Sequence, residues 1–138
     1  MGNYEQMNSR HQERFNALPM MFAFTGKQFA EGKEKLGVSK NSKLLSIGHG
    51  GYIRKADRKL FDDYYRETNG EMQEAQKDYD FCLSMFGYEL ANHEYCYTHD
   101  DAEVFRACGL TAEKVSSSDT LKKAFTTARK QYLATCEP

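Results

Sequence analysis

The sequence predicts an α+β fold, a single helix-rich domain over residues 1–138 with a small antiparallel sheet. Apolar side chains recur every three or four residues in two long stretches, which is typical of amphipathic helices. A glycine-rich tract between two short apolar runs is typical of a β-hairpin. No linker is long enough to separate two domains, and a chain of 138 residues suits one hydrophobic core.

The N-terminal part is expected to contain a helix, a strand and a second helix. Residues 4–18 are polar and helix-compatible, and Pro19 ends this helix because proline disfavours helical backbone before it. The apolar run 20–24 predicts a short strand. Thr25 is a suitable cap for the next helix, and Gly37 is a suitable end.

A β-hairpin is expected next. A polar link at residues 39–42 leads to an apolar run at 44–47, and a second short run covers 52–54. The glycines between these runs can adopt the positive φ angles that tight hairpin turns require. Strand, turn and strand is therefore the predicted order.

Two helices are expected to follow the hairpin. The first covers residues 57–68 and ends at Asn69-Gly70, because this dipeptide favours turns. The second covers residues 71–93 and has the strongest helical periodicity of the chain. Residues 95–98 are rich in β-favouring side chains and are expected to return to the sheet.

The C-terminal part is expected to be helical again. Asp100 or Asp101 can cap a short helix that Gly109 terminates, and a serine-rich loop at 116–119 precedes the last helix. The apolar stripe of that last helix should face the core and contains Leu121, Ala124, Phe125, Ala128 and Tyr132. Its cations should form a solvated face and are Lys122, Lys123, Arg129 and Lys130.

Composition narrows the classes of function. The 19 basic and 20 acidic residues nearly balance, which argues against a broad basic surface for nucleic acid. No apolar run approaches the roughly 18 residues needed to span a bilayer, and the N-terminus lacks a signal-peptide core. A cytoplasmic protein without a membrane partner is therefore expected, and a homo-oligomer is left open.

The four cysteines show no CxxC pair. They are expected to be reduced thiols in the core, because free cysteine is usually buried, and no structural zinc is expected. No cofactor is expected either.

The glycine tract is the main candidate site. Glycines can expose backbone amide groups, and nearby cations could pair with an anionic ligand. The candidate ligand-binding residues are Gly48, His49, Gly50, Gly51, Tyr52, Arg54 and Lys55. The tract matches neither the P-loop nor the dinucleotide-binding spacing, so a purely structural hairpin turn is the alternative.

A second candidate site lies around His93. His93, Cys96 and His99 are metal-ligating residues three apart, but the expected helix–strand boundary would point them in different directions. No metal site is therefore expected. Glu89 lies one helical turn before His93, and this pair is expected to make a helix-stabilising contact.

Three segments carry a resemblance to other proteins. They are MFAFTGKQFAEG at residues 21–32, KLG at 35–37 and YELANHEY at 88–95. They resemble a group of short uncharacterised proteins of phages, prophages and gut bacteria, over about residues 18–110. The resemblance implies a setting, a small accessory gene of a mobile element, rather than an activity.

The expected function is that of a non-enzymatic accessory protein that inhibits host antiviral defence by stoichiometric capture. Its partner is expected to be either a phosphorylated small molecule, such as a nucleotide, at the glycine tract or a host defence protein. Exposed tyrosine and phenylalanine would anchor the protein contact. The alternative is a small acid–base or metal-dependent enzyme that uses His49, His93 and Glu94.

Overall fold

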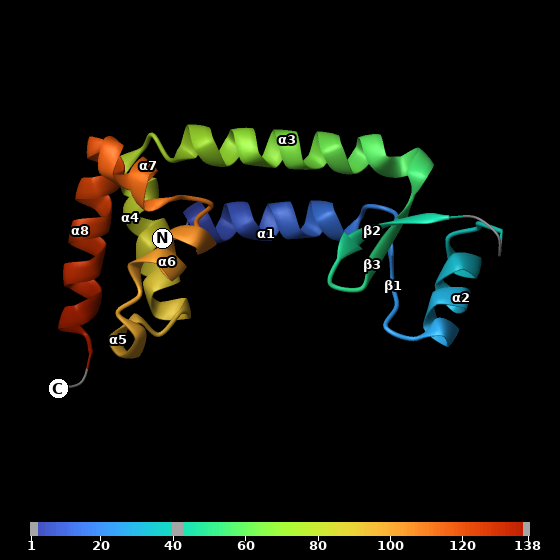
Figure 1. The fold of residues 1–138 in the computed structure, drawn as a ribbon. Helices are drawn as coiled ribbons and strands as arrows, with labels where there is room; N and C mark the ends of the chain where they lie inside the picture. Colours follow the sequence, from blue (N-terminus) through green and yellow to red (C-terminus); the bar gives the residue numbers. More distant parts are fainter. Residues whose placement is uncertain (1–2, 40–42, 137–138) are drawn as a thin grey trace. The chain divides into compact units, whose positions relative to one another are not determined.

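The computed structural model describes residues 3–39 and 43–136. Helices dominate this part of the chain, and three short strands form a small antiparallel sheet, so the expected α+β class is confirmed (Figure 1). Contacts divide the chain into two compact units. The first unit comprises Met1–His11 and Asn69–Pro138, and the second comprises Gln12–Thr68. The single-domain organisation stays a prediction.

The second unit contains the sheet, whose strand order is β1-β3-β2. The strands are β1 (Met21–Phe22), β2 (Leu44–Gly48) and β3 (Gly51–Arg54). Met21 lies opposite Tyr52, and Leu45 lies opposite Ile53. The predicted hairpin and the predicted first strand are both confirmed, although β1 is shorter than expected. Of the predicted polar link, residues 40–42 lie outside the described part of the chain.

Helix α2 (Gly26–Lys35) packs against β1 in the same unit. The Thr25 hydroxyl accepts a hydrogen bond from the backbone N–H of Gln28 at 3.1 Å, which is the predicted cap. Gly37 follows the helix with a φ of 72°, and the N–H of Val38 donates to the carbonyl of Lys33. This bond closes the helix end in a Schellman motif and confirms the predicted stop.

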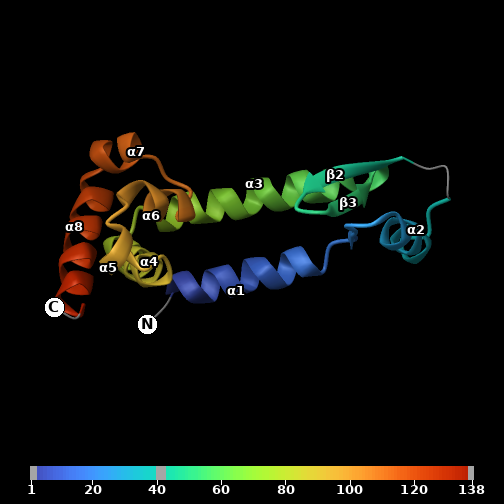
Figure 2. The ribbon, with the colours of Figure 1, turned by 60° about the horizontal axis from the view of Figure 1, so that its bottom comes forward.

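The first unit is built around α4 (Tyr79–Asn92) and α8 (Asp119–Ala134), which lie side by side in both ribbon views (Figures 1 and 2). Phe86 of α4 is fully buried, and its ring centroid lies 5.1 Å from that of Phe125 of α8. Phe105 completes the aromatic cluster, with its centroid 4.7 Å from that of Phe125. The predicted apolar stripes of these helices therefore form the core.

Two long helices begin or end away from their predicted limits. The N-terminal helix α1 covers Asn3–Asn16, close to its predicted range. Helix α3 covers Arg58–Ala75 and continues through Asn69-Gly70. The predicted end at that dipeptide is wrong, because glycine in a helix interior costs only about 1 kcal/mol and packing can outweigh it. The predicted helix over 71–93 is wrong as well. Asp78 interrupts it and caps α4 by accepting a hydrogen bond from the N–H of Phe81 at 2.8 Å.

The predicted strand at 95–98 is also wrong, since these residues form the short helix α5 (Tyr95–Thr98). Glu94 and His99 flank α5 with left-handed φ angles of 51° and 49°. Tyr95 is buried and its hydroxyl donates to the Asp101 carboxylate. The burial of Tyr95 and this hydrogen bond outweigh the β propensity of the segment.

The remaining helices follow their capping residues. Asp100 caps α6 (Asp101–Ala107), which ends before Gly109, and Ser118 caps α8. The cap at Asp100 and the end before Gly109 were expected, but the predicted loop at 116–119 is wrong, since only Ser118 lies between two helices. Helix α7 (Ala112–Ser117), capped by Thr111, was not predicted.

The cysteines depart in part from the expectation of four reduced thiols. Cys82 and Cys108 are free and buried, but Cys96 and Cys136 form a disulfide. They are 40 positions apart in the sequence, so no local spacing signalled the pair. The fold brings α5 beside the end of α8, which makes the bond geometrically accessible.

Candidate functional site

The glycine tract forms the turn between β2 and β3. Gly48, His49 and Gly50 all have positive φ angles, of 87°, 51° and 77°. A Cβ atom at Gly50 would lie 2.5 Å from Cε1 of Phe24, so this position needs glycine for space as well as for conformation. The tract therefore forms the structural hairpin turn that was the alternative to a ligand site.

Two polar groups of this turn have partners within the chain. The N–H of Gly48 donates to the Ser46 hydroxyl at 3.3 Å, and the carbonyl of Gly50 accepts from the N–H of Ala23 at 2.8 Å. His49 at the turn is exposed. Gly51 is buried, where a Cβ would lie 2.7 Å from Cγ1 of Ile47.

The two cations of the candidate site lie at the other end of β3. Arg54 is three residues beyond Gly51, about 10 Å along an extended strand. Its Nε donates to Oδ2 of buried Asp57 at 2.6 Å, and its Nη1 donates to the carbonyl of Leu36 at 3.4 Å. Lys55 follows it and is exposed. The structure does not bring these cations to the turn, and a ligand-binding role for the tract stays a prediction.

Tyr52, the remaining candidate residue, lies in the middle of β3. Its ring packs edge-on against Phe29 of α2, with centroids 5.0 Å apart. It therefore contributes to the packing of the helix on the sheet.

His93 belongs to a polar cluster of the first unit. Its Nδ1 lies 2.9 Å from Oε1 of Glu103 on α6, and its Nε2 lies 3.5 Å from Oε1 of buried Glu89. The predicted contact between Glu89 and His93 is therefore confirmed. The hydroxyl of buried Tyr4 donates to the other oxygen of Glu89. Burial, together with this hydrogen bond to a carboxylate, raises the pKa of Tyr4.

The contacts of this cluster hold the Glu89 carboxylate in place. Both oxygens of Glu89 are occupied, since Asn92 also donates to Oε1 at 3.3 Å. Glu94 is exposed at the start of α5, and His49 belongs to the second unit. No contact joins the three residues of the enzyme alternative within the described chain. Among residues 3–39 and 43–136, no group of His, Cys, Asp and Glu has the geometry to hold a metal ion.

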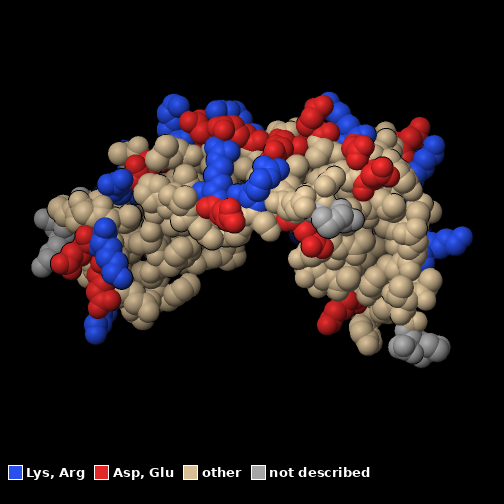
Figure 3. Space-filling view, turned by 180° about the vertical axis from the view of Figure 1, so that it is seen from behind, with Lys and Arg blue, Asp and Glu red and all other residues tan. Residues whose placement is uncertain are grey.

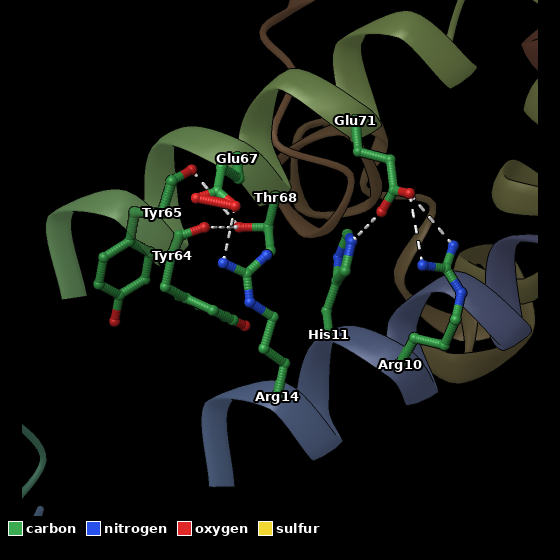
Figure 4. A network of polar contacts seen from close by, with 8 residues as sticks. All are labelled: Arg10, His11, Arg14, Tyr64, Tyr65, Glu67, Thr68 and Glu71. Atoms are coloured by element: carbon green, nitrogen blue, oxygen red, sulfur yellow. Dashed lines mark hydrogen bonds and ion pairs between the residues drawn. The ribbon is translucent and has the colours of Figure 1, made fainter. Parts of the chain in front are cut away.

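A second polar network joins α1 to α3 (Figure 4). In the first unit, Glu71 lies 2.5 Å from Nε2 of His11 and 3.3 Å from Nη2 of Arg10. The hydrogen bond to His11 is the main reason that the pKa of Glu71 lies below its usual range. In the second unit, Arg14 forms an ion pair of 2.9 Å with Glu67. These exposed pairs align two helices and contribute little individually.

The cations of α8 form the solvated face that the sequence predicts. Lys122, Lys123 and Lys130 are exposed, and Arg129 lies over the buried Phe125 ring, 5.2 Å from its centroid. On the face shown in Figure 3, the coloured Lys and Arg side chains lie beside Asp and Glu, and no broad basic area forms among them. No described helix is long and apolar enough to cross a bilayer.

Two hollows of the surface contain residues that the sequence analysis did not single out. The first, here called the aromatic groove, lies between β1 and α2, has a volume of about 540 Å³ and includes Phe22 and Phe24. Period-two alternation over residues 21–24 is the signal that could have revealed it. The second, here called the lysine cavity, belongs to the first unit, has a volume of about 560 Å³ and includes Lys77 and Lys114. These lysines are 37 positions apart, so no motif connects them.

The chain belongs to a family of unknown function, DUF7659, which it matches over residues 3–131. This membership agrees with the resemblance to uncharacterised proteins. A comparison with curated proteins gave no match, and neither did a comparison with solved structures.

Proposed function

We propose that this chain is a non-enzymatic binding protein that captures another protein through the aromatic groove of its second unit. The observation that carries the proposal is the exposure of two large aromatic side chains, one on β1 and one two residues beyond it. Phe22 is 55% exposed and Phe24 is 77% exposed. Exposed aromatic side chains beside a groove are the usual anchors of protein interfaces.

The surroundings of these rings fit an extended segment of a partner protein with apolar side chains. Strand β1 is at one edge of the sheet and pairs only with β3 in the described part of the chain. An edge strand beside a helix is a common receptor for an extended peptide. Apolar Met20, Met21 and Leu36 also line the groove.

The charged residues of the groove are Glu31 and Lys35, both on α2. They are opposite in sign, so the groove has no net charge that would select an ion. Apolar contact rather than charge should therefore provide most of the affinity.

Two other functions receive less support from the geometry. Capture of a phosphorylated molecule at the glycine tract lacks the convergence of Arg54 and Lys55 on the turn. The enzyme alternative lacks a contact among its three residues in the described chain. The mobile-element setting would make the partner a host defence protein and the chain an inhibitor of antiviral defence.

Site-specific photocrosslinking in the producing cell tests the proposal. A photoreactive phenylalanine analogue at Phe24 should give one dominant protein adduct, and the same analogue at Tyr97 should not. Tyr97 is the matched control because it is 85% exposed but belongs to the first unit. The absence of an adduct specific to position 24 would refute the proposal.

The identified partner is then purified and titrated calorimetrically. The double variant Phe22→Ser/Phe24→Ser should bind it at least about 30-fold more weakly, since an aromatic hot spot contributes about 2 kcal/mol or more. Tyr97→Ser should bind it like the wild type. Equal affinity of the double variant would also refute the proposal.

A further inference from the structure

We infer that the lysine cavity of the first unit is a binding site for a small organic phosphate. This site is independent of the aromatic groove, because every residue that lines the cavity belongs to the first unit. Its volume of about 560 Å³ is within the ordinary range of small-molecule sites.

The charge of the cavity favours an anion. Lys77 and Lys114 both line it, and none of the described lining residues is Asp or Glu. A phosphate monoester carries close to two negative charges at neutral pH, which matches two lysines better than a carboxylate would.

Both lysines can turn to a ligand at little cost. Lys114 forms no ion pair within the described residues. Lys77 pairs with Glu74 at 2.9 Å, but both side chains are exposed, and such a pair is worth little. An incoming phosphate could therefore replace Glu74 as the partner of Lys77.

The rest of the lining divides into an apolar base and a polar rim. Leu110 and Leu121 are buried, and Met72 is half-buried, so these side chains form the deep part of the cavity. Exposed Asn69 and Gln73 lie at the rim and carry amide groups that can donate hydrogen bonds. An apolar base with polar groups at the mouth suits an organic molecule that bears a phosphate, rather than inorganic phosphate alone.

The cavity also opens beside the first turn of α8, where Ser118 and Thr120 line it. The Ser118 hydroxyl is occupied, because it accepts from the N–H of Leu121 at 3.2 Å. No such bond engages the Thr120 hydroxyl in the described chain, and the start of a helix is electropositive. The same turn carries the acidic Asp119, so the two lysines rather than the helix provide the positive charge of the cavity.

Calorimetric titration of the full chain tests the site with four probes: adenosine 5′-monophosphate, ribose 5-phosphate, inorganic phosphate and adenosine. The nucleotide should bind most tightly, and adenosine should bind at least tenfold more weakly. Affinity should fall between about 50 and 300 mM salt, because partly exposed ion pairs are screened. The inference would be overturned if neither organic phosphate binds, or if adenosine binds as tightly as adenosine 5′-monophosphate. An affinity for the nucleotide that does not change with salt would overturn it as well.

Substitution then locates the site. Lys77→Gln/Lys114→Gln should weaken nucleotide binding tenfold or more, and Lys122→Gln/Lys123→Gln on the solvated face of α8 should not. Unchanged affinity of the first variant would overturn the inference. Lys114→Glu provides a second variant, and it should abolish nucleotide binding. The Phe22→Ser/Phe24→Ser variant changes the aromatic groove and leaves the lysine cavity intact. A failure of the phosphate site is therefore distinguishable from a failure of the protein-binding proposal.

Discussion

Phe86 provides the sharpest test of the core of the first unit. Its side chain is fully buried, and its ring makes edge-on contacts with Phe125 and Phe105 at centroid distances of 5.1 and 6.2 Å. Burial of a phenylalanine contributes about 1.5–3 kcal/mol. Each aromatic pair adds about 0.5–1.5 kcal/mol. Phe86→Ala should therefore lower the free energy of unfolding by about 3–5 kcal/mol, which is the usual range for such truncations.

A loss of this size is a large fraction of the about 5–15 kcal/mol that stabilises a typical domain. Urea denaturation followed by far-ultraviolet circular dichroism measures it, and the chain has no tryptophan to serve as an intrinsic probe. Tyr97→Ala is the matched control, since this ring is 85% exposed and its loss should change the stability by less than about 0.5 kcal/mol. If Phe86→Ala lies within about 1 kcal/mol of the wild type, the aromatic cluster does not organise this core.

Two further predictions concern a covalent bond and a titrating group. Cys96→Ser should lower the free energy of unfolding by about 4 kcal/mol, because the bond to Cys136 spans 40 positions and restricts the unfolded chain. Tyr4 has a raised pKa in the folded state because of burial, so its contribution to stability is complete below pH 10 and is lost as the pH rises further. Tyr4→Phe should therefore reduce the loss of stability between about pH 9 and 11, measured as the shift of the urea midpoint.

Each of these predictions has its own control. For the disulfide, dithiothreitol should destabilise the wild type and leave Cys96→Ser unchanged, and equal stability of the oxidised and reduced wild type would contradict the prediction. For the titrating group, Tyr97→Phe should keep the alkaline loss of the wild type. A Tyr4→Phe variant with that same loss would show that Tyr4 ionises normally in the fold.

Local signals in the sequence predicted much of the fold. The hydroxyls of Thr25 and Ser118 and the carboxylate of Asp100 cap the helices that follow them. The glycines at 48 and 50 form the predicted turn. These features were predictable because a cap or a tight turn involves residues only a few positions apart, and its energy depends little on the rest of the chain.

The wrong predictions for α3 and for residues 95–98 come from contacts that outweigh local propensity. Gly70 lies inside α3, and 95–98 form α5, because packing and a buried hydroxyl outweigh local propensities of about 1 kcal/mol. In the candidate site, too, the local feature was predicted and the side-chain contact was not. Its glycines lie where the sequence predicts a turn, but the partner of Arg54 was not predicted.

By itself, the sequence determined the fold class, several helix caps, the hairpin and the apolar stripes of α4 and α8. Only the tertiary structure decided that Cys96 meets Cys136, that Phe22 and Phe24 stay exposed, and that two distant lysines share one cavity. The physical reason is that capping and periodicity act over a few residues. Pairing, exposure and cavities depend on which distant segments the packed core brings together.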